Sequence, residues 1–166
     1  RHLVYGEESP LKMLTTGAQI LENAGATLII IACNTAHYYI NDILPHINIP
    51  ILNMIDLTSE YIYTTMKESG RIKAGILAST GTIRSGLYQK SLESFGIEPV
   101  LLPEHLQKEL VMEAVYGKSG IKAGYKREPE KLLGKAVKIL NAAGAHVIIE
   151  GCTEIPIVLR EKHSPV

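Results

Sequence analysis

The sequence predicts an α/β protein whose strands run parallel. Short runs rich in β-branched residues, typical of buried strands, alternate with longer segments whose apolar residues recur at helical spacing. This alternation is typical of parallel sheets flanked by helices, because two parallel strands need a crossover connection between them. The predicted strands are Thr27–Ala32, Pro50–Met54, Ala74–Ala78, Ile97–Leu102 and His146–Glu150.

The intervening segments predict helices. The first, Pro10–Asn23, carries Leu14, Ala18 and Leu21 on one face, and its proline suits a first helical turn. The same spacing predicts helices at Asp56–Glu68, Thr82–Ser94, Glu104–Val115 and Glu128–Ala142, and a short one after Cys152 that Pro156 limits. We therefore expect helices to cover the sheet on both faces.

Composition excludes several classes of protein. Seventeen Lys and Arg residues balance seventeen Asp and Glu residues, which argues against a general basic surface for nucleic acid. The longest apolar run, Leu28–Cys33, is too short to span a bilayer. Two cysteines argue against a disulfide-stapled secreted fold and against a cysteine-rich zinc module. The sequence therefore predicts a globular cytoplasmic domain without nucleic acid or membrane partners.

An internal repeat lies inside the alternation. The segments Leu21–Thr35 and Leu140–Glu154 both contain a helix end, Gly-Ala, an apolar strand, and then a cysteine followed by polar residues. The glycines Gly25 and Gly144 fit helix ends that need a positive φ, and the same spacing separates each from its cysteine. Each cysteine then falls at the C-terminal end of a parallel strand, where open α/β sheets bind ligands.

Two thiols at equivalent strand ends suit acid–base chemistry. A thiol has a reference pKa of about 8.5, so it takes up a proton as thiolate and gives one as thiol. Backbone N–H groups at a following helix start favour the thiolate and also hold carboxylates. Asn34 and Thr35 are expected to supply N-cap side chains and further donors at the first site. Thr153 and Glu154 are expected to do so at the second. If the repeats face each other, one cysteine can remove a proton from a carbon and the other can return one to the opposite face.

Other interpretations of the cysteines remain open at this point. A free cysteine is a common small core residue. A disulfide is disfavoured in a cytoplasmic chain. A metal site near Cys33 would need more ligands, and the one candidate close in sequence, His37, is equally suited to the helix surface or to a supporting hydrogen bond.

The segments Ala32–His37 (ACNTAH) and Gly151–Glu154 (GCTE) resemble the two signature segments of the aspartate/glutamate racemase family. The match is closest to the aspartate racemase branch and covers nearly the whole chain. The resemblance implies a racemase that uses no pyridoxal phosphate, no other cofactor and no metal. It implies two pseudo-symmetric α/β lobes with parallel sheets flanked by helices, and an active site between the lobes that takes one cysteine from each.

The resemblance also assigns substrate-binding roles outside the two motifs. Thr82 corresponds to a substrate-contacting threonine, and its turn, Ser79–Thr82, presents N–H groups and hydroxyls suited to an anion. Lys122 matches a lysine that binds substrate in aspartate racemases. Arg1 aligns with the arginine that pairs with the side-chain carboxylate, a role that suits the fork of an arginine.

The same resemblance predicts a partial first lobe. Residues 1–48, with Cys33, correspond to part of the first lobe, and residues 49–164, with Cys152, correspond to the second. Family members carry further first-lobe strands before the position of Arg1 and after that of Val166. We therefore expect a truncated first lobe whose exposed surface favours a homodimer.

These features together predict an isomerase that acts on a small amino acid. The preferred interpretation is a racemase for aspartate that uses Cys33 and Cys152 as a two-base pair at Cα. A hydantoin racemase or maleate isomerase is an alternative, and the retention of both cysteines argues against a one-cysteine decarboxylase. A truncated, non-catalytic ligand-binding protein is a second alternative. A redox dithiol is a third, and it needs both sulfurs within bonding reach.

Overall fold

A three-stranded parallel sheet organises most of the chain, and the computed structural model describes residues 2–159 apart from the side chain of Ser69. Its central strand β3 (Lys73–Ala78) pairs with β4 (Glu98–Val100) on one side and with β5 (Val147–Gly151) on the other. Both pairings are parallel. The α/β class with parallel sheets flanked by helices is thereby confirmed.

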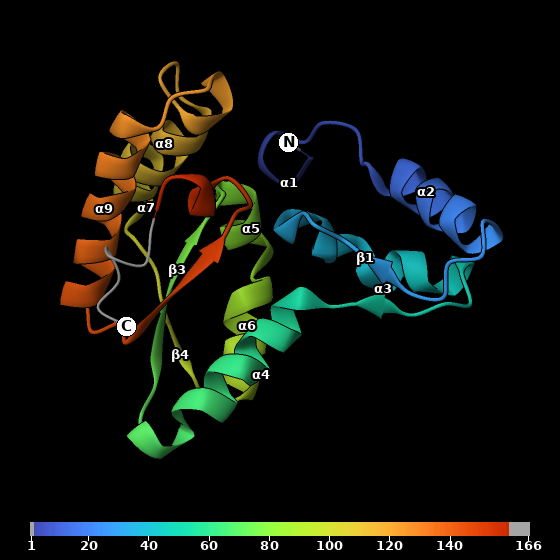
Figure 1. Cartoon of the computed structure of the whole chain (residues 1–166), viewed down its shortest axis with the longest axis horizontal. Coiled ribbons are helices and arrows are strands. Elements are labelled where there is room, and N and C mark those ends of the chain that lie inside the picture. The colour runs from blue at the N-terminus through green and yellow to red at the C-terminus, as the bar shows by residue number, and fades with distance from the viewer. Residues whose placement is uncertain (1, 160–166) are drawn as a thin grey trace.

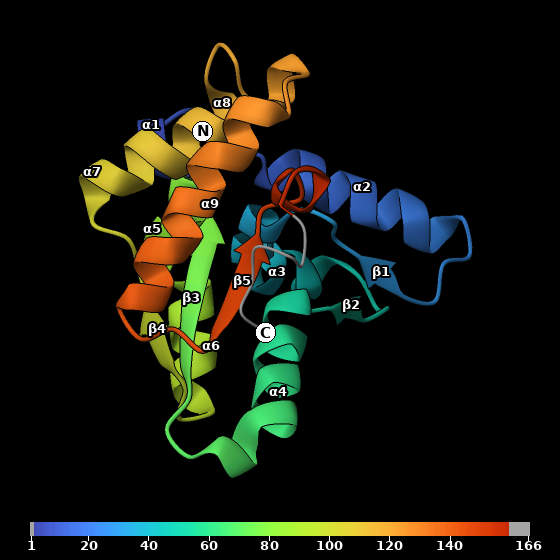
Figure 2. The same ribbon diagram turned by 60° about the vertical axis from the view of Figure 1, so that its left-hand side comes forward.

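Alternate residues of β3 face two different cores. Ala74, Ile76 and Ala78 pack with apolar side chains of α4 and α6, whereas Leu77 packs with the core under α9. The helices on the first side are α4 (Met54–Met66), α5 (Thr80–Ser85) and α6 (Leu87–Ser94), and those on the other side are α7 (Glu104–Leu106), α8 (Glu113–Tyr116) and α9 (Arg127–Ala142) (Figures 1 and 2). The sheet is therefore buried on both faces, which explains why its strands read as continuous apolar runs.

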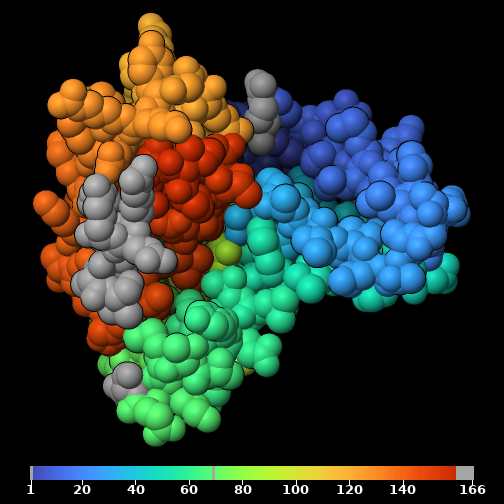
Figure 3. Space-filling model, viewed as in Figure 1, coloured from blue at the N-terminus to red at the C-terminus, as the bar shows by residue number. Residues whose placement is uncertain are grey.

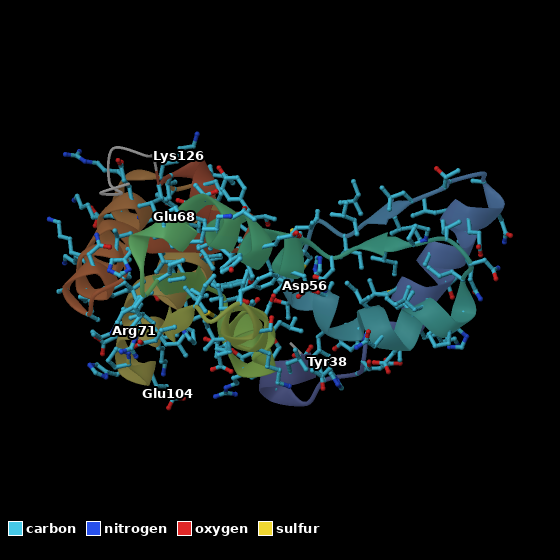
Figure 4. The ribbon with its side chains drawn as sticks, turned by 90° about the horizontal axis from the view of Figure 1, so that it is seen from below. Tyr38, Asp56, Glu68, Arg71, Glu104 and Lys126 are labelled. Atoms are coloured by element: carbon cyan, nitrogen blue, oxygen red, sulfur yellow. The ribbon has the colours of Figure 1, made fainter. Side chains whose placement is uncertain are left out.

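The N-terminal residues form a smaller group of elements around a second parallel pair. Strand β1 (Ile29–Ile30) pairs with β2 (Ile51–Leu52), and a separate apolar core joins this pair to α2 (Leu11–Asn23) and α3 (Ile40–Ile43). Figure 3 shows the segment after β5, in red, lying against this N-terminal part, in blue. In Figure 4, Asp56, at the start of α4, lies where the two groups meet.

One side of the smaller group is apolar and open. An apolar groove of about 470 Å³ runs between α2 and the β1–β2 pair, lined by Met13, Leu14, Gly17, Ala18, Ile20, Leu21, Ile29, Ile30, Ile31, Ile43 and Ile51. The side chains of Ile20 and Ile30 in this groove are 62% and 68% exposed. Exposed apolar side chains that form one continuous patch are typical of a surface that another structure covers.

The structure differs from the predicted elements at several places. The predicted helix Thr82–Ser94 is two helices, because Gly86 adopts a left-handed conformation between α5 and α6. The predicted helix Glu104–Val115 contains a π-helical turn, η4 (Gln107–Met112). Pro156 lies inside the short 3₁₀ helix η6 (Ile155–Ile157) rather than ending it, because a helical first turn does not need its missing N–H. The remaining 3₁₀ helices and the first helix are η1 (Asn34–Tyr39), η2 (Leu44–His46), η3 (Lys67–Ser69), η5 (Ile121–Ala123) and α1 (His2–Tyr5).

The boundary between residues 48 and 49 stays a prediction. The strand at Ile51–Leu52, which that boundary assigns to the second lobe, pairs with β1 in the smaller group. Residues 160–164 of the predicted second lobe lie outside the described part of the chain. In that described part, no helix has the length and apolar character needed to cross a membrane.

The two repeated glycines have the conformation that the repeat predicts. Gly25 follows α2 with a φ of 90°, and Gly144 follows α9 with a φ of 93°. A Cβ at Gly25 would meet no atom within 4 Å, and one at Gly144 would meet Lys73 only at ordinary contact distance. The conformation, and not a lack of space, is what requires glycine at both positions.

Substituting these glycines should therefore destabilise the fold only because a residue with a Cβ is strained at a positive φ. We expect Gly144→Ala to lower the free energy of unfolding by about 1–2 kcal/mol, the cost of a left-handed conformation for a residue with a Cβ. Gly134→Ala is the matched control, because Gly134 lies inside α9 with open space around it. That variant should gain up to about 1 kcal/mol from helix propensity. Urea denaturation measures both, and equal effects of the two changes would contradict the assignment.

Candidate functional site

The two cysteines of the repeat reach one cavity from different groups of elements. Cys152 directly follows β5, and Cys33 follows β1 and immediately precedes η1. Both are free thiols, Cys33 exposed and Cys152 buried. They line a cavity of about 80 Å³ together with Asn34, Thr35, Ser79, Thr82, Tyr116, Lys122, Gly151, Thr153 and Glu154. A larger hollow of about 810 Å³ shares Cys33, Thr35, Ser79 and Tyr116 with this cavity and so adjoins it.

Three hydroxyl groups join the Cys33 segment to the larger group of elements. The Oγ1 atoms of Thr35 and Thr82 lie 2.7 Å apart, and Ser79 Oγ lies 3.3 Å from the first and 3.2 Å from the second. Ser79 also accepts a hydrogen bond from the backbone N–H of Thr82, as the N-cap of α5. This hydroxyl cluster fixes the start of η1 against the start of α5.

Two further hydrogen bonds hold the segment after Cys33. The Tyr88 hydroxyl donates to Asn34 Oδ1 at 2.7 Å, in a buried position. Burial raises the pKa of Tyr88 to about 12, so its phenol stays protonated and remains a donor. The Nδ1 atom of His37 lies 3.0 Å from the carbonyl oxygen of Cys33, and its Nε2 accepts from the backbone N–H of Met54 at 3.3 Å.

His37 is therefore a neutral structural link between η1 and α4. One tautomer, with the proton on Nδ1, satisfies both of its contacts. Burial lowers the pKa of His37, which favours this neutral form. Among residues 2–159, no group of three or more His, Cys, Asp or Glu side chains gathers in a way that would hold a metal ion.

On the other side of the cavity, the Glu154 carboxylate contacts three groups. The Cys152 thiol donates to Glu154 Oε2 at 3.0 Å, and the Thr153 hydroxyl donates to the same oxygen at 3.0 Å. Lys122 Nζ lies 3.1 Å from Glu154 Oε1 and 4.8 Å from the centre of the Tyr116 ring. Lys122, from η5, is therefore held between a carboxylate and an aromatic face.

These contacts set the protonation of the site. Burial alone would raise the pKa of Glu154, but the hydrogen bonds from Cys152, Lys122 and Thr153 outweigh it and lower that pKa to about 2. Burial, and then the hydrogen bond to the Glu154 carboxylate, raise the pKa of Cys152 to about 12. The ion pair with Glu154 raises the pKa of Lys122. At neutral pH the site therefore holds a carboxylate, an ammonium group and a protonated Cys152.

The expectation that helix starts favour the thiolate is wrong for Cys152. The backbone N–H of Glu154 does act in the expected direction, but burial and the adjacent carboxylate outweigh it. The expected N-cap roles are confirmed only in the position of Glu154, which is the N-cap of η6 but makes no capping hydrogen bond with its side chain. The N-cap of η1 is Cys33, not Asn34 or Thr35, and its side chain makes no capping hydrogen bond either. Asn34, Thr35 and Thr153 are instead engaged by Tyr88, by the hydroxyl cluster and by Glu154.

Most of the side chains predicted for the site meet at this cavity. Asn34, Thr35, Thr82, Lys122, Thr153 and Glu154 line it with both cysteines, whereas Arg1 lies outside the described residues. Sequence reasoning missed Tyr116, because a tyrosine in the last turn of a helix before a glycine is typical of an exposed helix end. Its exposure of 51% fits that description, yet the ammonium group of Lys122 lies over its ring.

Parallel sheets and two repeat-related thiols in one cavity define an α/β protein with a paired-cysteine site. The family model described as Asp/Glu/Hydantoin racemase matches residues 4–166, and the chain belongs to that family. It is 30% identical to the broad specificity amino-acid racemase RacX of Bacillus subtilis (strain 168), over 93% of this chain and 64% of that protein. It is 26% identical to the glutamate racemase of Aquifex pyrophilus, over 87% of this chain and 52% of the relative.

Solved structures of related proteins also match this chain. The crystal structure of an aspartate racemase homologue from Pyrococcus horikoshii OT3 matches with a TM-score of 0.75 and 29% identity, over 94% of this chain and 66% of that one. A putative Asp/Glu racemase from Yersinia pestis matches with a TM-score of 0.77 and 28% identity, over the same shares. The chain thus spans about half to two thirds of the length of these relatives.

The different surroundings of the two thiols predict different reactivity. At pH 8 we expect iodoacetamide to alkylate Cys33 at least about tenfold faster than Cys152, because Cys33 is exposed whereas Cys152 is buried and protonated. Timed quenching followed by peptide mass spectrometry measures both rates in one sample. The urea-unfolded chain is the control, where the two rates should converge. Equal rates in the folded protein would contradict the burial of the Cys152 thiol.

Proposed function

We propose that the chain carries the two-cysteine site of an amino-acid racemase, and that aspartate is its substrate. The observation that carries this proposal is the single cavity lined by both repeat-related thiols. The family, and the racemase names of the relatives, support the reaction class. The substrate is proposed on the lysine at position 122, whose ammonium group suits a second carboxylate.

In the proposed reaction the two thiols exchange roles across the substrate. Cys33, as thiolate, removes the proton from Cα, and Cys152, protonated before the substrate arrives, delivers its own proton to the opposite face. Cys33 then carries the proton and Cys152 the negative charge. The ammonium group of Lys122 moderates the cost of that charge beside the Glu154 carboxylate.

The carbanion that forms at Cα needs hydrogen-bond donors at the substrate carboxylate. The hydroxyl cluster of Thr35, Ser79 and Thr82 supplies such donors at the cavity wall. Because Tyr88 donates to Asn34 Oδ1, the NH₂ group is the end of the Asn34 side chain that can donate to a ligand. Hydrogen-bonded neighbours fix both groups before the substrate binds, so little reorganisation accompanies charge development.

The proposal predicts that each cysteine is indispensable. Cys33→Ala and Cys152→Ala should each lower racemisation of L-aspartate by at least about a thousandfold, since each removes one proton-transfer group. Chiral chromatography measures the product, and loss of the Cα proton signal in deuterated water measures exchange by NMR. Thr64→Ala, on the exposed face of α4, is the control that should keep full activity.

The same assay separates the alternatives. Turnover of a hydantoin or of maleate, but not of aspartate, would change the proposed substrate and leave the proposed role of the cysteines in place. Aspartate binding without exchange of the Cα proton would instead identify a ligand-binding protein. Wild-type turnover by Cys33→Ala would contradict the two-base mechanism.

We also propose that the protein is a cytoplasmic homodimer. The reducing cytoplasm keeps the two thiols free, as the mechanism requires. A second copy covers the apolar groove between α2 and the β1–β2 pair, and a formal net charge of zero leaves little repulsion between copies.

Placing a charge in the groove should break this dimer. We expect Ile20→Glu to convert the protein to a monomer in light scattering, because burying a carboxylate in the interface is costly. Tyr61→Glu is the control, since Tyr61 is similarly exposed, at 70%, on α4 and outside the groove. A monomeric wild-type protein, or a dimeric Ile20→Glu variant, would rule out this interface.

A further inference from the structure

Tyr88, on α6, contacts the residue next to each of the two cysteines. Gly151 immediately precedes Cys152, and a Cβ added to Gly151 would lie only 3.0 Å from Cε2 of the Tyr88 ring. The hydroxyl group on the same ring donates to Oδ1 of Asn34 at 2.7 Å, and Asn34 immediately follows Cys33. One side chain therefore reaches from the end of β5 to the start of η1.

The glycine at position 151 is explained by this close approach. Gly151 is not among the glycines with a positive φ, so its backbone conformation is open to other residues. The constraint is space, because a Cβ there would also lie 3.0 Å from the Cβ of Ala78, whereas ordinary contacts between carbon atoms measure about 3.5–4.0 Å. A residue without a side chain lets the Tyr88 ring lie directly against the backbone.

The Tyr88 ring has little freedom to move between these two contacts. Tyr88 is 3% exposed and belongs to the apolar core beside α4 and α6, together with Ile55, Ile76 and Leu92. A close-packed core holds a planar ring in one position. Since the ring and its hydroxyl form one rigid group, we expect a displacement of Gly151 to be passed on to the side chain that the hydroxyl binds.

The spacing of the two thiols matters more for proton transfer than for substrate binding. In the proposed reaction both sulfurs must reach Cα from opposite faces, and a misplacement of about 1 Å can lower the rate about a hundredfold. Binding of the substrate carboxylates is proposed to depend on Lys122 and on the hydroxyl cluster instead. The hydrogen bond of Tyr88 goes to Asn34, beside one of the two proton-transfer groups. A fault in this contact should therefore affect turnover more than binding.

We propose that Tyr88 is a positioning residue that sets the spacing of the two thiols. Its ring holds the backbone before Cys152, and its hydroxyl holds the side chain after Cys33. This inference rests on the proposed function in its use of both thiols. It deepens that function by naming a residue outside the cavity lining on which their relative position depends.

The first test separates turnover from binding. Tyr88→Phe keeps the ring and removes the hydroxyl, so we expect kcat for aspartate to fall about ten- to a hundredfold while KM changes by no more than about threefold. Chiral chromatography at several substrate concentrations gives both constants. Tyr39→Phe is the matched control, because Tyr39 is also buried, at 5% exposed, and hydrogen-bonded to Ser9, but packs in the core of the smaller group. That variant should keep the wild-type kcat.

The second test follows the two cysteines without any turnover. Cysteine labelled with carbon-13 at Cβ gives one NMR signal each for Cys33 and Cys152, which single Cys→Ala variants assign. Gly151→Ala pushes against the Tyr88 ring, so we expect it to shift the Cys33 signal in the otherwise wild-type chain. In a Tyr88→Phe background the same change should leave the Cys33 signal in place, because the hydrogen bond to Asn34 is gone.

A matched control and three outcomes make the tests decisive. Gly134→Ala should move neither signal, since a Cβ at Gly134, inside α9, meets open space. A wild-type kcat in Tyr88→Phe, or a change in KM as large as that in kcat, would overturn the inference. So would a Cys33 signal that Gly151→Ala leaves in place, or one that it still shifts without the Tyr88 hydroxyl. If Gly151→Ala does not fold, the split between kcat and KM in Tyr88→Phe decides.

The inference and the proposed racemase can fail separately. A shift passed on through Tyr88 in a protein that does not exchange the Cα proton would sustain the role of Tyr88 and remove the racemase. An active racemase in which Gly151→Ala leaves the Cys33 signal in place would do the reverse.

Discussion

The candidate site depends on the hydroxyl cluster of Thr35, Ser79 and Thr82. The smaller group of elements has its own core, so nothing within that core fixes Cys33 relative to β5. The cluster fixes it, because the short contact between Thr35 and Thr82 joins the start of η1 to the start of α5. Since α5 follows β3, and β3 pairs with β5 up to Gly151, the position of Cys33 is tied to the residue just before Cys152. The sheet register and the hydroxyl cluster, supported by the hydrogen bonds from Tyr88 to Asn34 and from Met54 to His37, together bring the two thiols into one cavity.

Much of this arrangement could be predicted from local patterns. The repeat located both cysteines at strand ends and both glycines at helix ends, because Gly-Ala before an apolar strand reflects a backbone requirement that does not depend on tertiary context. The division of the helix at Gly86 was missed, since a single glycine inside a helical pattern is compatible with either a continuous or a broken helix. The long predicted strand at Thr27–Ala32 is two residues of paired strand, because pairing needs a neighbour that the sequence does not specify.

The electrostatics of the site could not be predicted in the same way. The sequence places Glu154 two residues after Cys152, but it does not say that the carboxylate turns back toward the thiol. That contact reverses the expected state of Cys152, because a neighbouring anion and burial favour the neutral thiol over the thiolate. Tyr116 was missed for a related reason. Its role beneath Lys122 arises from the meeting of α8 and η5, which no local spacing indicates.

The imidazole of His37 makes the joint between the two groups sensitive to acid. In its neutral form one ring nitrogen donates and the other accepts, whereas a protonated ring carries a proton on both. Protonation would therefore set a ring N–H against the backbone N–H of Met54, and one of the two contacts of His37 would be lost. Because burial lowers the pKa of His37 in the folded chain, the stability from this link is present above the histidine's ordinary pKa and is lost as the pH falls below it. Asp56, at the same junction, opposes this by favouring the charged ring. The link that holds the Cys33 side of the cavity against α4 therefore depends on pH.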